Sequence, residues 1–259
     1  MAGPIALTSA RAGADAIAVR IDRISIDRPL GRTLLAPNHG LVSAGQIGTY
    51  SVPRRMYQWT IDEAAGVARL ANPAGGDEIF VKLNPLVGCI GVCPPRGQRI
   101  STLFAGAHGG NMDLPSLGVG TTIYLPTFAD GALVMLGDVH AAQGHGEAIG
   151  GGIEVCATVS ITMRVVRDWP IVSPHLLTAT EIGAIATDGD LRTAIQVAYG
   201  RLIVWLFGLG MNRFDAYQLL SQVARIEIGN LVTSPFSVAV LCAIDQLPSV
   251  ARRKLEENA

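Results

Sequence analysis

The chain has 259 residues, enough for one large domain or two small ones, and 49% of them are hydrophobic. Charged residues make up only 16%, and the formal net charge is −1. Thinly spread basic residues lack the electrostatic footprint of a nucleic-acid-binding protein, so we expect no nucleic-acid partner. A sparsely charged, apolar composition indicates extensive burial and favours an oligomer.

The first residues, Met1-Ala-Gly-Pro-Ile5, show neither the basic region nor the apolar run of a signal peptide. We therefore expect a cytoplasmic protein whose cysteines stay reduced. Cys89 and Cys93 lack the spacing of a zinc knuckle, and all four cysteines are expected to be buried thiols. The most apolar run, residues 202–211, falls far short of the roughly twenty residues that cross a bilayer, so no membrane partner is expected.

The first half of the sequence predicts short strands joined by glycine-rich turns. Apolar residues alternate from Ile17 to Ile21 and resume in the opposite phase at Ile24. Such a change of phase predicts a strand with a bulge near Asp22.

Further strands are expected over residues 79–83, 121–125 and 132–136, with a loop over residues 84–95. The clearest strand covers residues 153–166, where apolar and polar side chains alternate along the whole length. Alternation of this length predicts a strand with one buried face.

The last third of the chain changes to helical spacing. Asp188 or Asp190 is expected to cap a helix that ends at Gly208. Asn212 begins a second helix that continues to about Arg225.

The apolar stripe of this second helix includes Phe214 and Tyr217, which we expect to face the core. The elements together predict a mainly β, α+β fold: a glycine-rich β-sandwich or barrel-like core with a C-terminal αα-hairpin. Residues 1–170 are expected to form the β-rich core with the active-site loop. Residues 171–259 would add the helical hairpin and closing β segments to the same globular unit.

Asp138 and His140 are separated by one residue, so both side chains leave one face if the preceding strand continues. A carboxylate beside an imidazole forms half of a typical metal site. The glycine-rich residues 144–146 allow a sharp turn that would bring Glu147 and Glu154 to the same place. The alternative is a hydrogen-bonded loop in which Asp138 caps backbone amides and His140 packs in the core.

A second candidate site is the segment Gly109-Gly-Asn-Met-Asp113, beside His108. Its glycines allow the backbone to approach a ligand closely, although a tight turn with Asx hydrogen bonds is the simpler reading. The sequence has no Gly-x-Ser-x-Gly elbow, phosphate-binding loop or dinucleotide fingerprint, so these chemistries are not indicated.

Four blocks in one order resemble the acetamidase/formamidase family. The most specific is Leu136-Gly-Asp-Val-His-Ala-Ala-Gln-Gly-His-Gly-Glu147. It follows Asn84-Pro-Leu-Val-Gly-Cys-Ile-Gly-Val-Cys-Pro94, Gly109-Gly-Asn-Met-Asp113 and Thr122-Ile-Tyr-Leu-Pro126. The resemblance runs from about residue 3 to about residue 248.

The resemblance implies a largely β amidase that cleaves a small carboxamide to acid and ammonia. It implies a divalent metal, zinc or alternatively calcium, with Asp138, His140 and Glu154 as ligands. Amide hydrolysis needs an activated water and a stabilised oxyanion, and a divalent metal supplies both.

Carried over by position, Glu147 would be a ligand or the general base, and His145 a second catalytic residue. Asn111, Asp113 and His108 would line the substrate pocket. The family usually has an aspartate where this chain has His145. A histidine can still ligate or move a proton, which keeps open another C–N substrate such as a carbamate or a guanidino compound.

Gly3-Pro-Ile5 resembles a stretch that lies well inside family sequences, so we expect the N-terminal β segment of relatives to have no counterpart in this sequence. We expect a homo-oligomer, or a split enzyme in which a small subunit supplies that segment. The alternative from a different class is a non-catalytic structural or binding subunit that kept the fold.

Overall fold

The structure is a computed structural model that describes residues 1–71 and 75–258. Its helical elements are α1 (Leu191–Gly208), α2 (Arg213–Val223), α3 (Ser249–Asn258), η1 (Ala44–Ile47), η2 (Pro95–Gly97) and η3 (Ile244–Gln246). Its strands are β1 (Ala2–Ile5), β2 (Ala16–Leu35), β3 (Arg55–Asp62), β4 (Val67–Leu70), β5 (Ile79–Lys82), β6 (Leu86–Gly91), β7 (Ala105–Gly106), β8 (Gly109–Asn111), β9 (Thr122–Pro126), β10 (Val134–His140), β11 (Glu154–Val166), β12 (His175–Leu177), β13 (Glu181–Asp188), β14 (Arg225–Ile228) and β15 (Phe236–Ala243).

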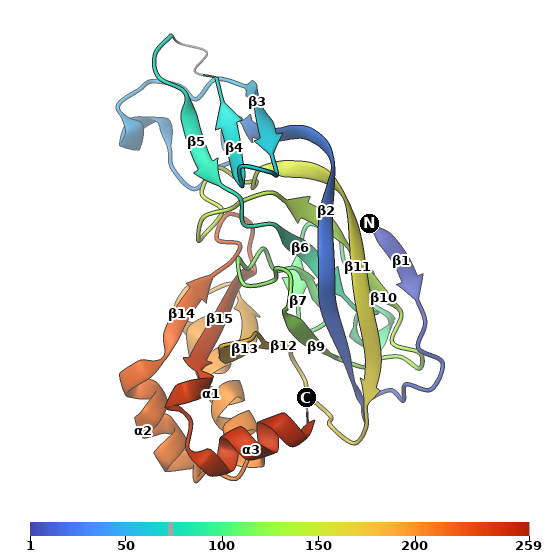
Figure 1. Cartoon of the computed structure of the whole chain (residues 1–259). Coiled ribbons are helices and arrows are strands. Elements are labelled where there is room, and N and C mark those ends of the chain that lie inside the picture. Colours follow the sequence, from blue (N-terminus) through green and yellow to red (C-terminus); the bar gives the residue numbers. More distant parts are fainter. Residues whose placement is uncertain (72–74, 259) are drawn as a thin grey trace.

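The described strands form a curled antiparallel sheet in the order β14-β15-β13-β12-β9-β2-β11-β10-β6-β8-β7. Strands β3, β4 and β5 branch from β2, with which β3 pairs, and form a three-stranded flap (Figure 1). Strand β1 pairs with β10. The inner face carries fully buried side chains such as Ile17, Ile90 and Leu125. The predicted mainly β, barrel-like core with a C-terminal helical hairpin is therefore confirmed.

The long strands β2 and β11 run side by side along the molecule (Figure 1). Ser160 pairs with Arg23 and Ile161 pairs with Ile21, so the register slips by one residue at Asp22. This slip is the bulge that the change of phase predicted. Side chains of β11 alternate between half-buried and exposed positions, as the sequence pattern predicted.

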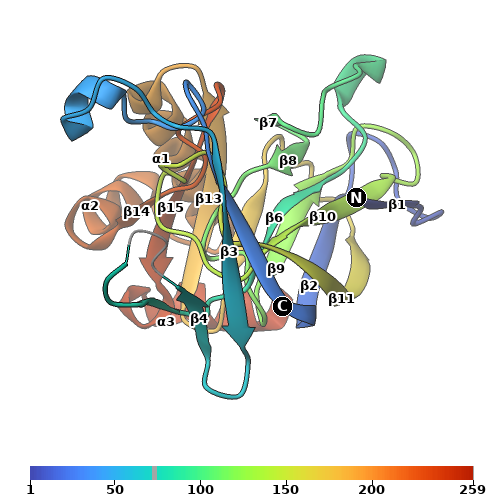
Figure 2. The ribbon, with the colours of Figure 1, turned by 90° about the horizontal axis from the view of Figure 1, so that it is seen from above.

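Helix α1 packs against β13 and β15, and α2 packs beside α1 and β15 (Figure 2). Ala251 and Leu255 of α3 belong to the same hydrophobic cluster. Both helix caps are confirmed. The Asp190 carboxylate accepts from the Thr193 amide at 2.8 Å, and the Asn212 side chain accepts from the Phe214 amide at 2.8 Å. Among the described residues, none of the helices combines the length and the apolar character that a bilayer crossing requires.

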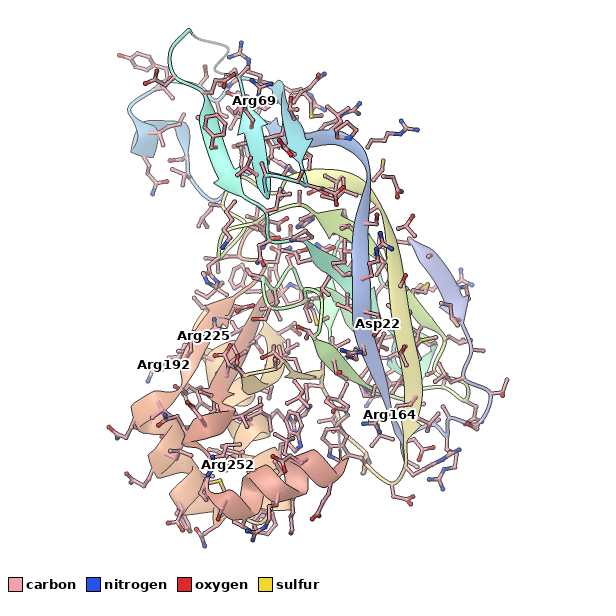
Figure 3. The ribbon with its side chains drawn as sticks, viewed as in Figure 1. Asp22, Arg69, Arg164, Arg192, Arg225 and Arg252 are labelled. Carbon is pink, nitrogen blue, oxygen red and sulfur yellow. The ribbon has the colours of Figure 1, made fainter. Side chains whose placement is uncertain are left out.

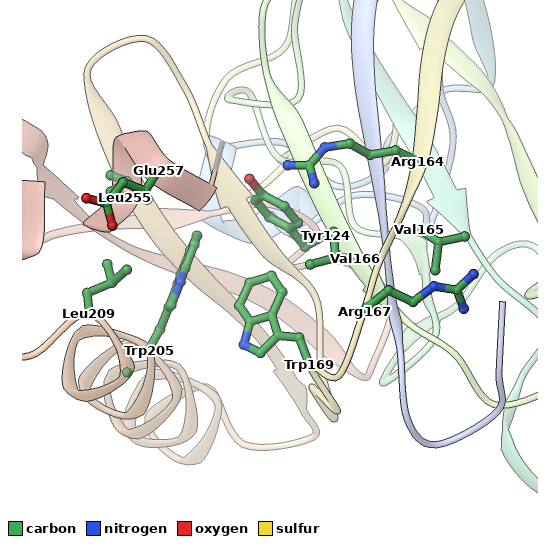
Figure 4. Close-up of a pocket in the computed structure, with 11 residues that line it drawn as sticks. Tyr124, Arg164, Val165, Val166, Arg167, Trp169, Trp205, Leu209, Leu255 and Glu257 are labelled. Atoms are coloured by element: carbon green, nitrogen blue, oxygen red, sulfur yellow. The ribbon is translucent and has the colours of Figure 1, made fainter. Parts of the chain in front are cut away.

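An aromatic cluster joins α1 to the strands beneath it. The Tyr124 ring on β9 lies 5.0 Å from Trp169 and 5.7 Å from Trp205, measured between ring centroids. These rings line a cavity whose other side is formed by Leu209 of the α1–α2 turn and Leu255 of α3 (Figure 4). Edge-to-face ring contacts of this kind add to the stability that burial alone gives.

Two expectations, about a loop and about the buried face of a helix, were wrong. Residues 84–95, expected as a loop, contain the fully buried strand β6. In α2, Phe214 and Tyr217 are exposed, and the buried face is formed by the smaller Ala216 together with Leu220.

The expectation of four buried cysteines was also wrong, because Cys156 is exposed and Cys93 is half-buried. Cys156 occupies the polar side of the alternating strand β11, so its position in the pattern already placed it outward.

Candidate active site

The end of strand β10 brings the first two candidate ligands together. Asp138 has a left-handed backbone (φ 62°), so the strand does not continue regularly up to His140. On the neighbouring strand β6, a Cβ atom at Gly88 would lie 2.6 Å from Asp113 Oδ1 and 3.1 Å from Asp138 Oδ2. A side chain at position 88 would therefore fill the space in which the two carboxylates meet.

His140 is at the centre of the cluster and is 1% exposed. Its Nε2 atom lies 3.1 Å from Glu154 Oε1 and 3.7 Å from Asp138 Oδ1. Glu154 reaches this position because β10 pairs with β11 at the His140–Glu154 register. The Asp138 and Glu154 side chains remain 35% and 42% exposed, so the cluster is open to small ions.

A hydrogen-bond relay fixes the orientation of the imidazole. Gln143 Nε2 donates to the Asp113 carbonyl oxygen at 2.6 Å, which leaves Gln143 Oε1 facing His140 Nδ1 at 2.7 Å. An amide oxygen only accepts, so Nδ1 carries the hydrogen. Nε2 then faces Asp138 and Glu154, the orientation in which an outer hydrogen bond prepares a histidine to ligate a metal.

The carboxylates of Asp138 and Glu154 determine the charge of His140. Burial lowers the pKa of His140, but Asp138 and Glu154 outweigh burial and raise it to about 11. The metal-free site therefore holds an imidazolium, and a divalent cation would replace its Nε2 proton.

Asp113 is fully buried and also has a left-handed backbone (φ 49°). Its Oδ2 atom accepts hydrogen bonds from Asn111 Nδ2 at 2.7 Å and Asn230 Nδ2 at 3.2 Å. The sequence placed Asp113 in the substrate pocket. The structure instead groups it with Asp138 and His140, whose potential ligand atoms all lie within 4.8 Å of one another.

Glu147 lies in a second, overlapping group with His140 and Glu154, again within 4.8 Å. The turn that places it is closed by a hydrogen bond from the Glu147 amide to the Gly144 carbonyl at 3.2 Å. Glu147 is buried, with 7% of its surface exposed. Burial raises the pKa of the carboxyl groups of both Glu147 and Asp113, and the charge of Glu147 raises that of Asp113 further.

A cavity of about 530 Å³ adjoins this cluster. Glu147 and Gln143 form part of its lining, and His145 also lines it but belongs to neither group of potential ligands. His108 is placed elsewhere: it lines a separate cavity of about 290 Å³ together with Cys89 and Met135.

Two residues at the site were not identified as candidates from the sequence. Gln143 lies inside the family signature, but only the structure shows its contact with His140. Asn230 reaches Asp113 across 117 residues of sequence. Its only signal was an amide side chain after a glycine within an otherwise apolar segment.

The cluster fits a divalent cation. In the part of the chain that the structure describes, Asp113 Oδ1 is buried without a hydrogen-bond partner, and buried His140 Nε2 faces only the carboxylates of Glu154 and Asp138. Buried polar atoms normally have a partner, and a metal ion would serve both at once. One imidazole nitrogen with several carboxylate oxygens is a donor set that zinc accepts.

Comparisons with known proteins identify the family of the chain. Residues 36–247 match the model of the acetamidase/formamidase family. The acetamidase of Yersinia enterocolitica has a similar structure, with a TM-score of 0.85 and 29% identity over 95% of this chain and 74% of its own. The acetamidase of Bacillus halodurans aligns with a TM-score of 0.79 and 26% identity over 100% of this chain and 86% of its own.

A formamidase of Methylophilus methylotrophus is 30% identical over 157 residues, which cover 52% of this chain and 38% of that enzyme. The chain spans about half or less of the length of the curated relatives it matches. The family model, however, covers most of this chain and contains all the residues of the cluster. The chain belongs to the acetamidase/formamidase family.

Proposed function

We propose that this chain is a metal-dependent amidase that cleaves a carboxamide to a carboxylic acid and ammonia. The observation that carries the proposal is the convergence of Asp113, Asp138, Glu147 and Glu154 on His140, with a buried Asp113 oxygen that lacks a hydrogen-bond partner. The names of the family and of its acetamidase and formamidase members support the choice of reaction.

Asp138, His140 and Glu154 would hold the cation, with Asp113 as a further ligand, and zinc is the metal we propose. A bound divalent cation would supply Lewis-acid polarisation of the amide carbonyl and would make water more acidic. Gln143 keeps the His140 ring in its ligating orientation, and Asn111 and Asn230 hold the Asp113 carboxylate.

Glu147 would move the protons. A general base works best with a pKa near the working pH, and burial raises the pKa of Glu147 toward neutrality. Its carboxylate would take a proton from the attacking water and then give it to the nitrogen of the leaving amine. Ammonia then leaves as a neutral molecule, while the acid product remains.

The test is Asp138→Asn, which keeps the side-chain volume but removes the charge. Ammonia release from formamide, acetamide and longer amides is measured with added zinc, for wild type and variant. We expect the variant to lose activity by about a hundredfold or more, because a metal ligand and its charge are removed. Asp215→Asn is the matched control, since Asp215 is exposed on the first turn of α2.

Two results would contradict the proposal. One is equal activity in wild type and Asp138→Asn, which would place the chemistry elsewhere. The other is no ammonia from any amide with a folded, zinc-loaded wild type, which would favour a non-catalytic role for this chain.

A further inference from the structure

The cavity beside the cluster extends well beyond the reacting groups. It is lined by Trp59 and Val81 of the flap strands and by residues of the loop that follows β10, among them Ile149 and Ile153. The apolar part of its lining consists mainly of Trp59, Val81, Ala142, Ile149 and Ile153, and Thr33 and Asn84 add polar side chains beside Gln143 and Glu147. Lys82 and His145 are exposed residues of the lining and lie where the cavity meets solvent.

The wall is held in place by contacts of its own. Trp59 is 8% exposed, and its Nε1 donates to Thr33 Oγ1 at 3.1 Å. Trp59, Ala142 and Ile153 also belong to one buried hydrophobic cluster. A wall that is packed and hydrogen-bonded in this way does not collapse onto a small ligand.

The volume of the cavity indicates the size of the substrate that would fill it. Acetamide has four heavy atoms and fills roughly the space of two or three water molecules, on the order of 60–90 Å³. The cavity holds about 530 Å³, which lies in the range of sites for much larger ligands. A substrate as small as acetamide would leave most of the apolar wall in contact with water.

We propose that the preferred substrates are primary carboxamides with an extended apolar acyl group, which lies along Val81 and Ile153 while the amide faces Glu147. This inference rests on the proposed amidase function and names its substrate class. Burial of the acyl chain would add binding energy remote from the reacting carbon, which an enzyme can use to favour the transition state.

The first experiment compares kcat/KM for formamide, acetamide, butyramide and hexanamide with the zinc-loaded full chain. We expect kcat/KM to rise by roughly fourfold per added methylene, since burying one methylene contributes about 0.8 kcal/mol. A kcat/KM that is highest for formamide or acetamide and falls with chain length would overturn the substrate class.

The second experiment fills the cavity with Val81→Phe. We expect the ratio of kcat/KM for hexanamide to that for acetamide to fall about fifteenfold, because the acyl chain loses the burial of roughly two methylenes. Ile79→Phe is the matched control, because Ile79 lies on the same strand, is 49% exposed and is not part of the cavity lining. The control should leave the ratio unchanged.

An unchanged ratio in Val81→Phe would place the acyl group outside this cavity and overturn the proposal. Failure of the amidase function gives a different result: no ammonia from any amide of the series, rather than ammonia from the short ones alone.

Discussion

The position of His140 depends on a glycine in the next loop. A Cβ atom at Gly152 would lie 2.6 Å from Cγ and from Nδ1 of the His140 ring, closer than any real side chain approaches. The ring is 1% exposed and linked to Gln143, so it cannot move aside without breaking that hydrogen bond. Gly152 therefore acts as a positioning residue for the imidazole.

We expect Gly152→Ala to lower kcat/KM by at least about tenfold, because a displaced imidazole no longer meets Asp138 and Glu154 in the same geometry. The midpoint of thermal unfolding should also fall, since overpacking a buried site costs roughly 1–3 kcal/mol. Both are measured beside Gly144→Ala, where an added Cβ meets nothing within 4 Å. Equal effects of the two substitutions would rule out the positioning role.

Some residues of the site could be predicted from the sequence, and others could not. Asp138 and His140 could be paired because they are close in sequence, and the glycines after them indicated a turn toward Glu147. Asn230 could not be paired with Asp113, because nothing local in the sequence indicates which strand end meets which loop. The same limit applies to His108, which is adjacent to the Gly109–Asn111 strand but lines a separate cavity.

At the scale of elements, the β14–β15 hairpin fixes the segment that carries Asp113. Ser237 of β15 donates to the Met112 carbonyl oxygen. The buried Glu227 of β14 accepts from both the amide and the hydroxyl of Ser116. Arg225 of β14, which is labelled in Figure 3, donates to Glu227 at 2.9 Å. The C-terminal part of the chain is therefore part of the site's support.

Elements with regular alternation were predicted well, and elements rich in glycine were not. Strand β11 has thirteen residues of alternating character, and its two faces follow from the pattern. Strand β6 reads as a loop because its glycines interrupt the pattern. Gly88 serves the site, however, since a side chain there would meet Asp113 and Asp138. Hydrophobic patterns indicate which side chains are buried, so they do not identify a strand where the site requires glycine, which has no side chain.

An ion-pair cluster far from the site joins the loop before β2 to the residues that follow β11. Asp15 has a fully buried side chain that accepts from Arg11 Nη2 at 2.6 Å and from Arg167 Nη1 at 2.8 Å. The hydrogen bond from Arg11 is the main reason that the pKa of Asp15 lies well below its usual range. The contact therefore stabilises the fold at neutral pH, where the carboxylate is charged in both states.

This stabilisation should be lost as the pH falls, because a carboxyl group with a lowered folded pKa binds protons more readily when unfolded, where its pKa is about 3.9. We expect Asp15→Asn to lower the free energy of unfolding in urea at pH 7, and by less at pH 3. Asp168→Asn, at an exposed partner of Arg11, should have little effect at either pH. A difference between wild type and Asp15→Asn that is constant with pH would contradict this role.

At the scale of the whole molecule, the curled sheet brings four distant segments to one place. The end of β10, the start of β11, the segment after β8 and the β14–β15 connection all contribute to the cluster. The sequence predicted the class of fold, because alternation and helical spacing are local. It did not predict the order of the strands, since pairing of β9 with β2 and β12 depends on contacts between distant segments.

The central claim is that this cluster binds one divalent cation on which amide cleavage depends. The most direct measurement is ammonia release by the metal-stripped full chain as zinc is added stepwise, with the best amide of the series as substrate. The account predicts negligible release without metal, followed by a rise that saturates near one equivalent of zinc. A stripped chain that releases ammonia at the full rate, with no response to zinc, would contradict it.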